Sequence, residues 1–268
     1  MSNAIEKNLN DNGVLKLSLN RPDVLNAMNA DLIMGLLEGF NEAKADKKVR
    51  SIIITGNGRG FCSGADLVDG GWPKTKGLTG GEAGAITMEN AFNPLVKAIT
   101  QSTKPVVNAI NGMAAGGGVG LALTGDIVVA AESAKFKLVF GPNLGIISDV
   151  GASWFVPNLI GRARANGMGL LGEDISAQQA KDWGLIWDCV PDNELMSVCD
   201  EIANKLANGP TAGLKEIVKA HDKALSGSLS EQLDYEKEIQ RVRLDSKEFK
   251  EGVSAFIEKR KPNFRDLE

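Results

Sequence analysis

The chain has 268 residues, of which 43% are hydrophobic and 24% are charged. This length and balance can bury one sizeable core and argue against a disordered chain. The formal net charge of −4 excludes a general attraction to nucleic acid or to an anionic membrane, so we expect neither as a partner. The N-terminal residues contain no apolar signal segment, and a cytoplasmic location is therefore expected.

Strands and helices alternate through residues 1–192, which we expect to form the core. The first strand, Val14–Leu19, precedes a helix with an apolar stripe that starts at Leu32 behind Asn29, a residue type that caps helices well. Further strands are expected at Ile52–Thr55, Val106–Ile110, Ile127–Ala130, Phe136–Val139 and Ile186–Val190, and further helices near Gly118–Leu123, near Gly151–Ile160 and from Ser176 to Gly184. This alternation predicts an α/β fold.

Residues 193–268 have a different pattern, and we expect them to form a separate helical region. Apolar residues recur there at helical spacing in three stretches, which start at Leu195, Leu214 and Phe249. Each helix would then have an apolar face that needs a surface to cover it. His221, the only histidine, falls on the second stripe, so a structural role is favoured and a histidine-dependent hydrolase is not expected.

The segment 69–84 is rich in Gly, Pro and Lys and has no periodicity. It is predicted to be a loop, either a mobile one over the site or a plain surface loop. Cys62, Cys189 and Cys199 are odd in number and show no C-x-x-C spacing. We therefore expect neither a disulfide framework nor a metal site.

Two glycine-rich loops each follow an expected strand. One is Gly56–Gly64, and the other contains Gly116, Gly117 and Gly118 before an apolar helical segment. Glycines at the start of a helix leave bare backbone N–H groups, which bind a negatively charged oxygen. No Gly-Lys-Ser/Thr follows them, which excludes a phosphate-binding P-loop. Two such loops can hold one oxyanion, although close packing of helix and strand would require the same glycines.

Three motifs in these regions together resemble the enoyl-CoA hydratase/isomerase family, also called the crotonase superfamily. They are LNRPDVLNAMN at Leu19–Asn29, GRGFCSGADL at Gly58–Leu67 and NGMAAGGGVGLAL at Asn111–Leu123, and the likeness extends from Val14 to Phe264. The resemblance implies a spiral of strand-strand-helix repeats. It also implies that the C-terminal helices pack on neighbouring subunits to make a homo-oligomer, either a trimer or a dimer of trimers.

The resemblance further implies an acyl-CoA substrate. The two oxyanion donors of the family match the backbone N–H groups of Ala65 and Gly117. No permanently bound cofactor is implied, because coenzyme A arrives as part of the substrate. The family's contacts to coenzyme A match positions in the first two motifs and, from a neighbouring subunit, in the last helix: Arg21, Asp23, Val24, Leu25, Ala65, Asp66, Leu67, Phe256, Lys259 and Lys261. The alternatives are a surface turn for the first charged residues and a basic helix end for the lysines.

The reactions of the family differ in the acid and base residues that they use. Its hydratases commonly use two glutamates, and the matching positions here are Gly120 and, within one residue, Phe140. The acid that does match a pocket position is Asp149, in a segment typical of the isomerase branch. A single base beside an oxyanion hole can take a proton from one carbon of an enoyl thioester and return it to another.

Asp149 has an alternative interpretation as the N-cap of the helix expected near Gly151. A capping role would lower its pKa and apolar neighbours such as Phe140 would raise it, and the sequence leaves this balance open. Glu82 and Glu89 are the reserve acids for a hydratase. If Asp149 is only a cap, a catalytically silent acyl-CoA binder is the remaining alternative.

Three motifs later in the chain point to one branch of the family. GRARA at Gly161–Ala165, GEDISAQQAKDWGLIW at Gly172–Trp187 and EGVSAFIEKR at Glu251–Arg260 are similar to the phenylacetate-pathway isomerase branch. That branch converts ring-epoxyphenylacetyl-CoA to an oxepin thioester and also shifts enoyl double bonds. We therefore expect a CoA-thioester isomerase with Asp149 as its base, and the acyl group stays open.

Overall fold

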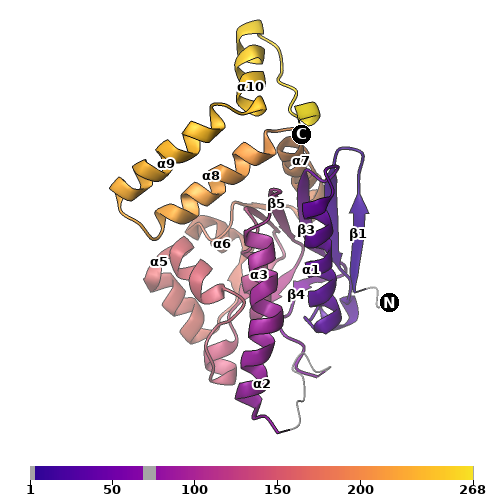
Figure 1. Ribbon diagram of the computed structural model, residues 1–268. Helices are drawn as coiled ribbons and strands as arrows, with labels where there is room; N and C mark the ends of the chain where they lie inside the picture. The colour runs from indigo at the N-terminus through magenta and orange to yellow at the C-terminus, as the bar shows by residue number, and fades with distance from the viewer. Residues whose placement is uncertain (1–3, 69–76, 268) are drawn as a thin grey trace.

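The computed structural model describes residues 4–68 and 77–267, which form two sheets surrounded by helices (Figure 1). The larger sheet has six strands in the order β1-β2-β3-β5-β7-β10. β1 is antiparallel to β2, and every later pair is parallel. The strands are β1 (Ile5–Leu9), β2 (Val14–Leu19), β3 (Ser51–Gly56), β5 (Val106–Ile110), β7 (Ile127–Ala131) and β10 (Asp188–Val190).

A smaller sheet has four strands in the order β4-β6-β8-β9. Three of these strands come directly after strands of the larger sheet, since β4 follows β3, β6 follows β5 and β8 follows β7. The strands are β4 (Gly60–Cys62), β6 (Met113–Ala115), β8 (Lys135–Lys137) and β9 (Ile175–Ser176). In each repeat the chain passes from one sheet to the other and then into a helix, which confirms the expected spiral.

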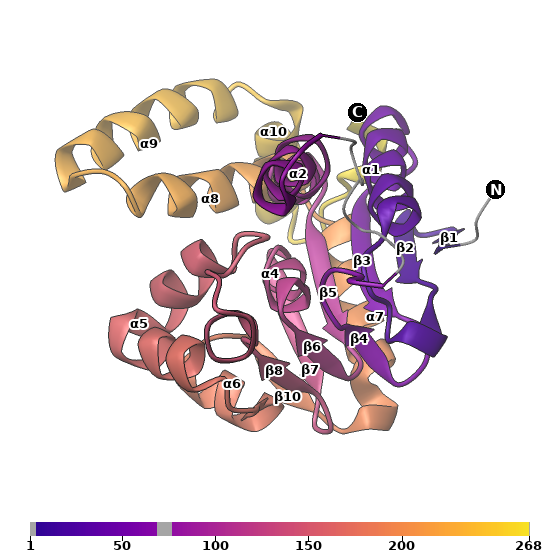
Figure 2. The same cartoon turned by 90° about the horizontal axis from the view of Figure 1, so that it is seen from below.

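Helices cover the sheets and extend beyond them. α1 begins where it was expected, because the Asn29 side chain accepts a hydrogen bond from the Leu32 N–H at 3.1 Å. The α-helices are α1 (Ala30–Ala45), α2 (Gly80–Thr87), α3 (Asn93–Thr100), α4 (Gly117–Ala122), α5 (Ala152–Leu171), α6 (Ala177–Trp183), α7 (Leu195–Ala207), α8 (Thr211–Ala224), α9 (Leu229–Arg243) and α10 (Lys247–Glu258). Shorter 3-10 helices are η1 (Pro22–Val24), η4 (Asp192–Glu194) and η5 (Arg265–Leu267), and two π-helices are η2 (Met88–Phe92) and η3 (Phe140–Leu144). The short α4 lies in the middle of the molecule, between α5 and the strands (Figure 2).

The central parallel strands β3 and β5 of the larger sheet are buried on both faces, as a parallel sheet requires. Ile52, Ile53 and Ile54 of β3 are all fully buried. α7 packs against β3 and β5 and places Cys199 in the same core. The packed unit therefore extends past residue 192, and the helices that project from it begin at α8.

The loop expected at 69–84 is shorter than the sequence suggested. It ends at Thr79, because the Thr79 and Glu82 side chains form a capping box that starts α2. Residues 69–76 of this loop lie outside the described part of the chain. A role for the loop over the site stays a prediction.

The segment after β7 also differs from the expectation. β8 ends at Lys137, two residues before the expected Val139, and η3 follows it as a π-helix. A π-helix is a single wide turn that takes an extra residue, and it is often found near functional sites.

Helices α8, α9 and α10 form an arm that projects from the sheets (Figure 1). The arm is anchored by buried Lys215, whose Nζ lies 2.8 Å from Asp126 Oδ1, while Asp126 Oδ2 accepts the Val106 N–H at 2.8 Å. Much of the arm's apolar surface is exposed in the single chain. The exposed side chains are Ile217, Leu225, Leu229, Leu233, Val242, Leu244, Phe249, Val253, Phe256 and Ile257.

Candidate active site

The two glycine-rich loops meet at Gly64 and Gly117. Gly64 has a φ of 98°, and a Cβ atom there would lie 3.2 Å from the Gly117 nitrogen and 3.0 Å from the Ala115 carbonyl oxygen. Gly118 is closed against β4, since a Cβ atom would lie 2.1 Å from the Cys62 carbonyl oxygen. The glycines therefore let two backbones approach at the start of α4. This close contact of the two backbones is compatible with both alternatives, dense packing and an oxyanion site.

The N–H groups of Ala65 and Gly117 are the expected oxyanion donors. Ala65 forms a parallel bridge with Met28, in which the Met28 N–H donates to Gly64 O at 2.8 Å and the Asp66 N–H donates to Met28 O at 3.0 Å. This pairing turns the Ala65 N–H to the opposite side. Gly117 is the first residue of α4, so its N–H has no partner inside the helix. In the part of the chain that the structure describes, neither N–H has a hydrogen-bond acceptor.

Asp149 lies beside Gly117. A Cβ atom at position 117 would be 3.3 Å from Asp149 Oδ1. Burial raises the pKa of Asp149 to about 6, although its own backbone N–H bonds the charged form and opposes the rise. No charged side chain of the described residues contributes to this shift. A carboxyl group with this pKa can accept and return a proton near neutral pH.

The capping interpretation of Asp149 is wrong. α5 begins at Ala152, its N-cap is Gly151 with a φ of 79°, and its end has no side-chain cap. Asp149 contributes only its carbonyl oxygen, which accepts the Ala152 N–H at 2.9 Å. The carboxyl group is therefore free to face Gly117. Of the two opposing influences on its pKa, desolvation is the larger.

Neither position matched to a hydratase glutamate can supply an acid. A Cβ atom at Gly120 would lie 2.2 Å from the carbonyl oxygen of Val150, so the backbone of residue 150 fills the space of a side chain. Phe140 is a buried phenylalanine whose Cζ lies 3.9 Å from the Cβ position of Gly116. The ring makes the neighbourhood of the glycines apolar. Asp149 is left as the acid whose carboxyl group contacts α4.

The reserve acids are placed poorly for catalysis. Glu82 is exposed and its Oε2 accepts the Thr79 N–H at 2.7 Å, which lowers its pKa. A carboxylate with a lowered pKa is a weak base. Glu89 lies on η2 with its side chain exposed. The expectation that one of them replaces a hydratase glutamate is not supported by these surroundings.

Cys62 and His221 have no catalytic surroundings. Burial raises the pKa of the Cys62 thiol to about 12, so it is protonated and unreactive in the folded chain. His221 lies on α8 with its side chain exposed. It borders a cavity of about 680 Å³ that also includes Trp154, Trp187 and Asp222. That cavity is lined in part by residues that directly follow α4, from Leu123 on, and includes neither Gly117 nor Asp149.

Arg21 and Asp66, two of the residues expected at coenzyme A, are bound to each other. Arg21 Nη1 lies 2.8 Å from Asp66 Oδ2 and donates to Ala27 O at 2.5 Å. Both side chains are largely buried, so this pair joins the first motif to the second. Their contact with coenzyme A stays a prediction.

Asn26 is a structural residue that the sequence argument missed. It is fully buried with a φ of 56°, and its Nδ2 donates to Gly60 O at 2.8 Å and to Asn57 O at 3.1 Å. Its Oδ1 accepts the Arg21 N–H at 2.8 Å. Asn tolerates the left-handed region better than most residues, which was the available signal. The amide fixes the turn that carries the proposed coenzyme A contacts.

The rest of the predicted coenzyme A residues form an exposed border. Val24 is 45% exposed and Leu67 is 65% exposed. Asp23 is exposed, and Leu25 caps η1 with a φ of 52°. An adenine ring or pantetheine chain could cover this border, and that contact stays a prediction.

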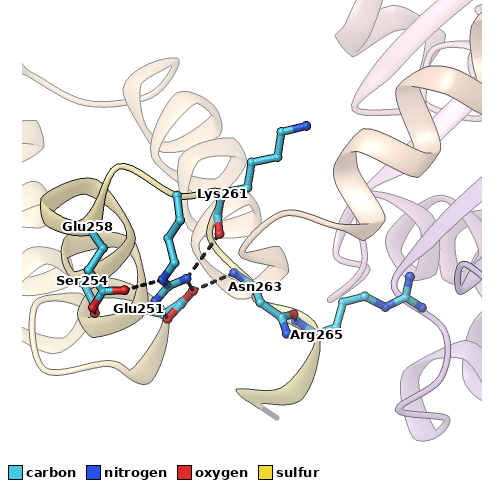
Figure 3. Close-up of polar contacts among 7 residues, drawn as sticks. Glu251, Ser254, Glu258, Lys261, Asn263 and Arg265 are labelled. Atoms are coloured by element: carbon cyan, nitrogen blue, oxygen red, sulfur yellow. Dashed lines mark hydrogen bonds and ion pairs between the residues drawn. The ribbon is translucent and has the colours of Figure 1, made fainter.

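Phe256 lies on α10 and Lys259 is the C-cap of this helix, which lies at the opposite end of the molecule from α2 (Figure 1). Phe256 is 85% exposed, and Lys259 ends the helix with a φ of 56°. The chain after α10 is held by Glu251, which binds Arg260 and accepts the Asn263 N–H at 2.7 Å (Figure 3). These bonds lower the pKa of Glu251 to about 2. A contribution of α10 to a coenzyme A site on another copy of the chain stays a prediction.

Among residues 4–68 and 77–267, every helix is too short or too polar to span a membrane. The same residues hold no group of three or more His, Cys, Asp or Glu side chains that could bind a metal ion.

Known proteins resemble this chain over almost its whole length. The family described as enoyl-CoA hydratase/isomerase matches residues 10–267. The chain is 44% identical over 256 residues to 1,2-epoxyphenylacetyl-CoA isomerase of Escherichia coli K12, with 95% of each chain covered. It is 40% identical over 252 residues to a protein of Rhodobacter capsulatus named probable enoyl-CoA hydratase, with 94% of each covered.

A solved structure shows the same fold. The crystal structure of an enoyl-CoA hydratase from Polaromonas sp. JS666 superposes with a TM-score of 0.89 at 31% identity, over 97% of this chain and 98% of that one. The match extends through the two sheets and the C-terminal helices. The chain therefore belongs to the enoyl-CoA hydratase/isomerase family.

Proposed function

We propose that this protein is a CoA-thioester isomerase in which Asp149 moves the proton. The observation that carries the proposal is the position of the Asp149 carboxyl group beside Gly117, with a pKa raised to about 6. The N–H groups of Ala65 and Gly117 would hold the thioester oxygen. Their hydrogen bonds strengthen as negative charge develops on that oxygen, which lowers the barrier to forming an enolate.

The reaction needs no added atom. Asp149 takes a proton from the carbon next to the thioester of a 3-enoyl-CoA, and the C–H electron pair moves into a dienolate whose charge rests on the thioester oxygen. The same carboxyl group then returns the proton to the far carbon of the dienolate, and the double bond becomes conjugated with the thioester. One acid with a pKa near neutrality can perform both steps.

A hydratase is a weaker alternative for this chain. Hydration needs groups that hold and deprotonate a water molecule as well as a proton donor. The glutamate positions are occupied by Gly120, where a side chain would collide with Val150, and by buried Phe140. A silent binder is disfavoured because the Asp149 carboxyl group does not cap α5.

The acyl group can be proposed only from relatives. A relative of 44% identity is named 1,2-epoxyphenylacetyl-CoA isomerase. We infer that a ring-epoxide acyl-CoA is a second substrate to test, since its rearrangement also adds no water. A relative of 40% identity is named as a hydratase, so the test must report hydration separately.

The experiment follows two thioesters with purified protein. A 3-enoyl-CoA and a 2-enoyl-CoA are incubated separately with wild-type protein and with Asp149→Asn, and products are followed by ultraviolet absorbance and mass. Wild type should form the conjugated isomer at unchanged mass. Loss of the positioned base in Asp149→Asn should lower kcat by about 10²–10⁴-fold. An epoxyphenylacetyl-CoA follows as the third substrate.

The matched control is Asp11→Asn, which makes the same change on an exposed residue in the turn between β1 and β2. This variant should keep wild-type kcat. A mass gain of one water from the 2-enoyl-CoA would replace the proposal with hydration. Full isomerase activity in Asp149→Asn would remove Asp149 from the mechanism.

A further inference from the structure

Val150 has a backbone conformation that its side chain disfavours. Its φ is 51°, although a β-branched residue rarely enters the left-handed region. The residue is 3% exposed, and Gly151 after it also has a positive φ of 79°. Strained residues of this kind persist only where their surroundings hold them, and they concentrate at functional sites.

The surroundings of Val150 are two glycines of α4. A Cβ atom at Gly117 would lie 2.9 Å from Val150 Cγ2, and a Cβ atom at Gly120 would lie 2.9 Å from Val150 Cβ and 2.8 Å from its carbonyl carbon. Residues 117 and 120 are one helical turn apart and lie on the same face. Val150 therefore packs against one face of α4, with its side chain at Gly117 and its backbone at Gly120.

We propose that Val150 is a positioning residue that holds Asp149 against Gly117 and fills the place of a second acid at position 120. This inference rests on the proposed function and deepens it, because it names what restricts the site to proton transfer. The Asp149 side chain leaves the backbone directly before the left-handed residue. A change of φ at Val150 would turn the peptide that follows Asp149 and draw its carboxyl group from α4.

The same packing keeps water from the carboxyl group. Val150 and Phe140 are both buried on the side of the glycines, and burial is the cause of the raised pKa of Asp149. Loss of the Val150 side chain would let water reach the carboxylate. The positioning role and the pKa of Asp149 are thus expected to change together.

The first test is Val150→Gly, which adopts the positive φ without strain but removes the buried side chain and frees the backbone. The pKa of Asp149 is measured directly by NMR titration of protein labelled with ¹³C at aspartate carboxyl groups. The signal is assigned by its absence in Asp149→Asn. We expect the pKa to fall from about 6 by about one pH unit or more as water enters.

Kinetics separate positioning from general damage. In Val150→Gly, kcat should fall about tenfold or more, while KM for the CoA ester changes less than about twofold, because the two N–H donors are untouched. The acidic limb of the pH profile should move with the measured pKa. An unchanged pKa together with unchanged kcat would overturn the proposal. A lower kcat and a higher KM without any change in the pKa of Asp149 would also overturn the proposal.

Val150→Ala serves as the second variant, and it keeps a Cβ atom in case Val150→Gly does not fold. It removes only the two γ carbon atoms, of which Cγ2 lies against Gly117, so it should give a smaller change of the pKa and of kcat in the same direction. No change of the Asp149 pKa in this variant would count against the proposal.

A double-mutant cycle tests the second half of the proposal. Gly120→Ala alone should lower the melting temperature and kcat, because its Cβ atom would meet the Val150 backbone. In the Val150→Gly background the loss should be smaller, since the glycine can move away. Gly167→Ala is the matched control, because a Cβ atom there meets nothing within 4 Å. Additive losses would refute the coupling.

Failure of the proposed function would be seen separately. If wild type does not isomerise any tested thioester, the function is wrong. The NMR titration and the double-mutant cycle in melting temperature still decide whether Val150 positions Asp149.

Discussion

The spiral around α4 and the arm of α8, α9 and α10 differ in how tightly they are packed. Around α4 the backbones approach so closely that glycines are required at positions 64, 117, 118 and 120. On the arm, Gly252 has nothing within 4 Å of a Cβ atom, and Phe256 and Ile257 are 85% and 72% exposed. The groups proposed for proton transfer thus all lie in one chain, whereas much of the apolar surface of the arm is exposed in that single chain.

The largest effect is expected where the two regions are joined. Lys215→Met removes the cation from buried Asp126 and should lower the free energy of unfolding by about 3–5 kcal/mol. Urea denaturation measures this loss. Lys219→Met is the matched control on the same helix, because its pair with Glu216 is exposed and its loss should cost under about 1 kcal/mol. Equal losses in the two variants would show that the arm does not depend on the buried pair.

A smaller effect of opposite sign is expected at Asp149. Its folded pKa is raised from 3.8 to about 6, so ionisation above pH 6 destabilises the folded state and protonation below pH 3.8 removes that cost. Asp149→Asn should therefore raise the free energy of unfolding by about 3 kcal/mol at pH 8. The gain should shrink as the pH falls from 6 to 4.

Chemical denaturation at pH 4 and pH 8 measures this difference, with Asp11→Asn as the control that should show none. A gain of the same size at both pH values would mean that the carboxylate is not the cause. The stabilised variant should also be the inactive one, as is common when an active site holds a buried charge.

The smallest effect on the chain's own stability is expected on the arm. Phe256→Ser and Ile257→Ser together replace exposed side chains and should change the free energy of unfolding of one chain by less than about 0.5 kcal/mol each. If a second copy covers this face, the double variant should lower the mass measured by analytical ultracentrifugation. Lys250→Ser, an exposed polar change on α10, is the control for mass. An unchanged oligomer would place the partner surface elsewhere on the arm.

Periodicity predicted many of the strands and helices because these depend on local spacing, but β1, β4, β6, α2, α3 and α9 were not among the predicted elements. The cap of Asn29 and the strands at Val14–Leu19 and Val106–Ile110 were placed correctly. The end of β8 was misplaced because the π-helix η3 follows it. The start of α2 was missed although its capping box, Thr79 with Glu82, is a local signal. The packing of α7 on the sheet also could not be read from its stripe, because an apolar face does not state what covers it.

The candidate site was predicted in composition but not in geometry. Gly117, Ala65 and Asp149 could be named from motifs, yet the sequence could not decide whether Asp149 caps a helix. The answer depends on the left-handed turn at Val150 and Gly151, and valine gives no sign of that conformation. The Arg21–Asp66 pair was missed for a related reason, since its partners are far apart in the chain.

The two buried thiols, Cys62 and Cys199, can be used to measure local opening of the structure around them. Cys62 lies on β4 under α4, and Cys199 lies on α7 under the larger sheet, and burial raises the pKa of each to about 12. A thiol reagent can reach either one only when the surrounding structure opens. The labelling rate of Cys62 divided by that of Cys199, measured in native buffer, would therefore show whether the structure around the site opens independently of the larger sheet.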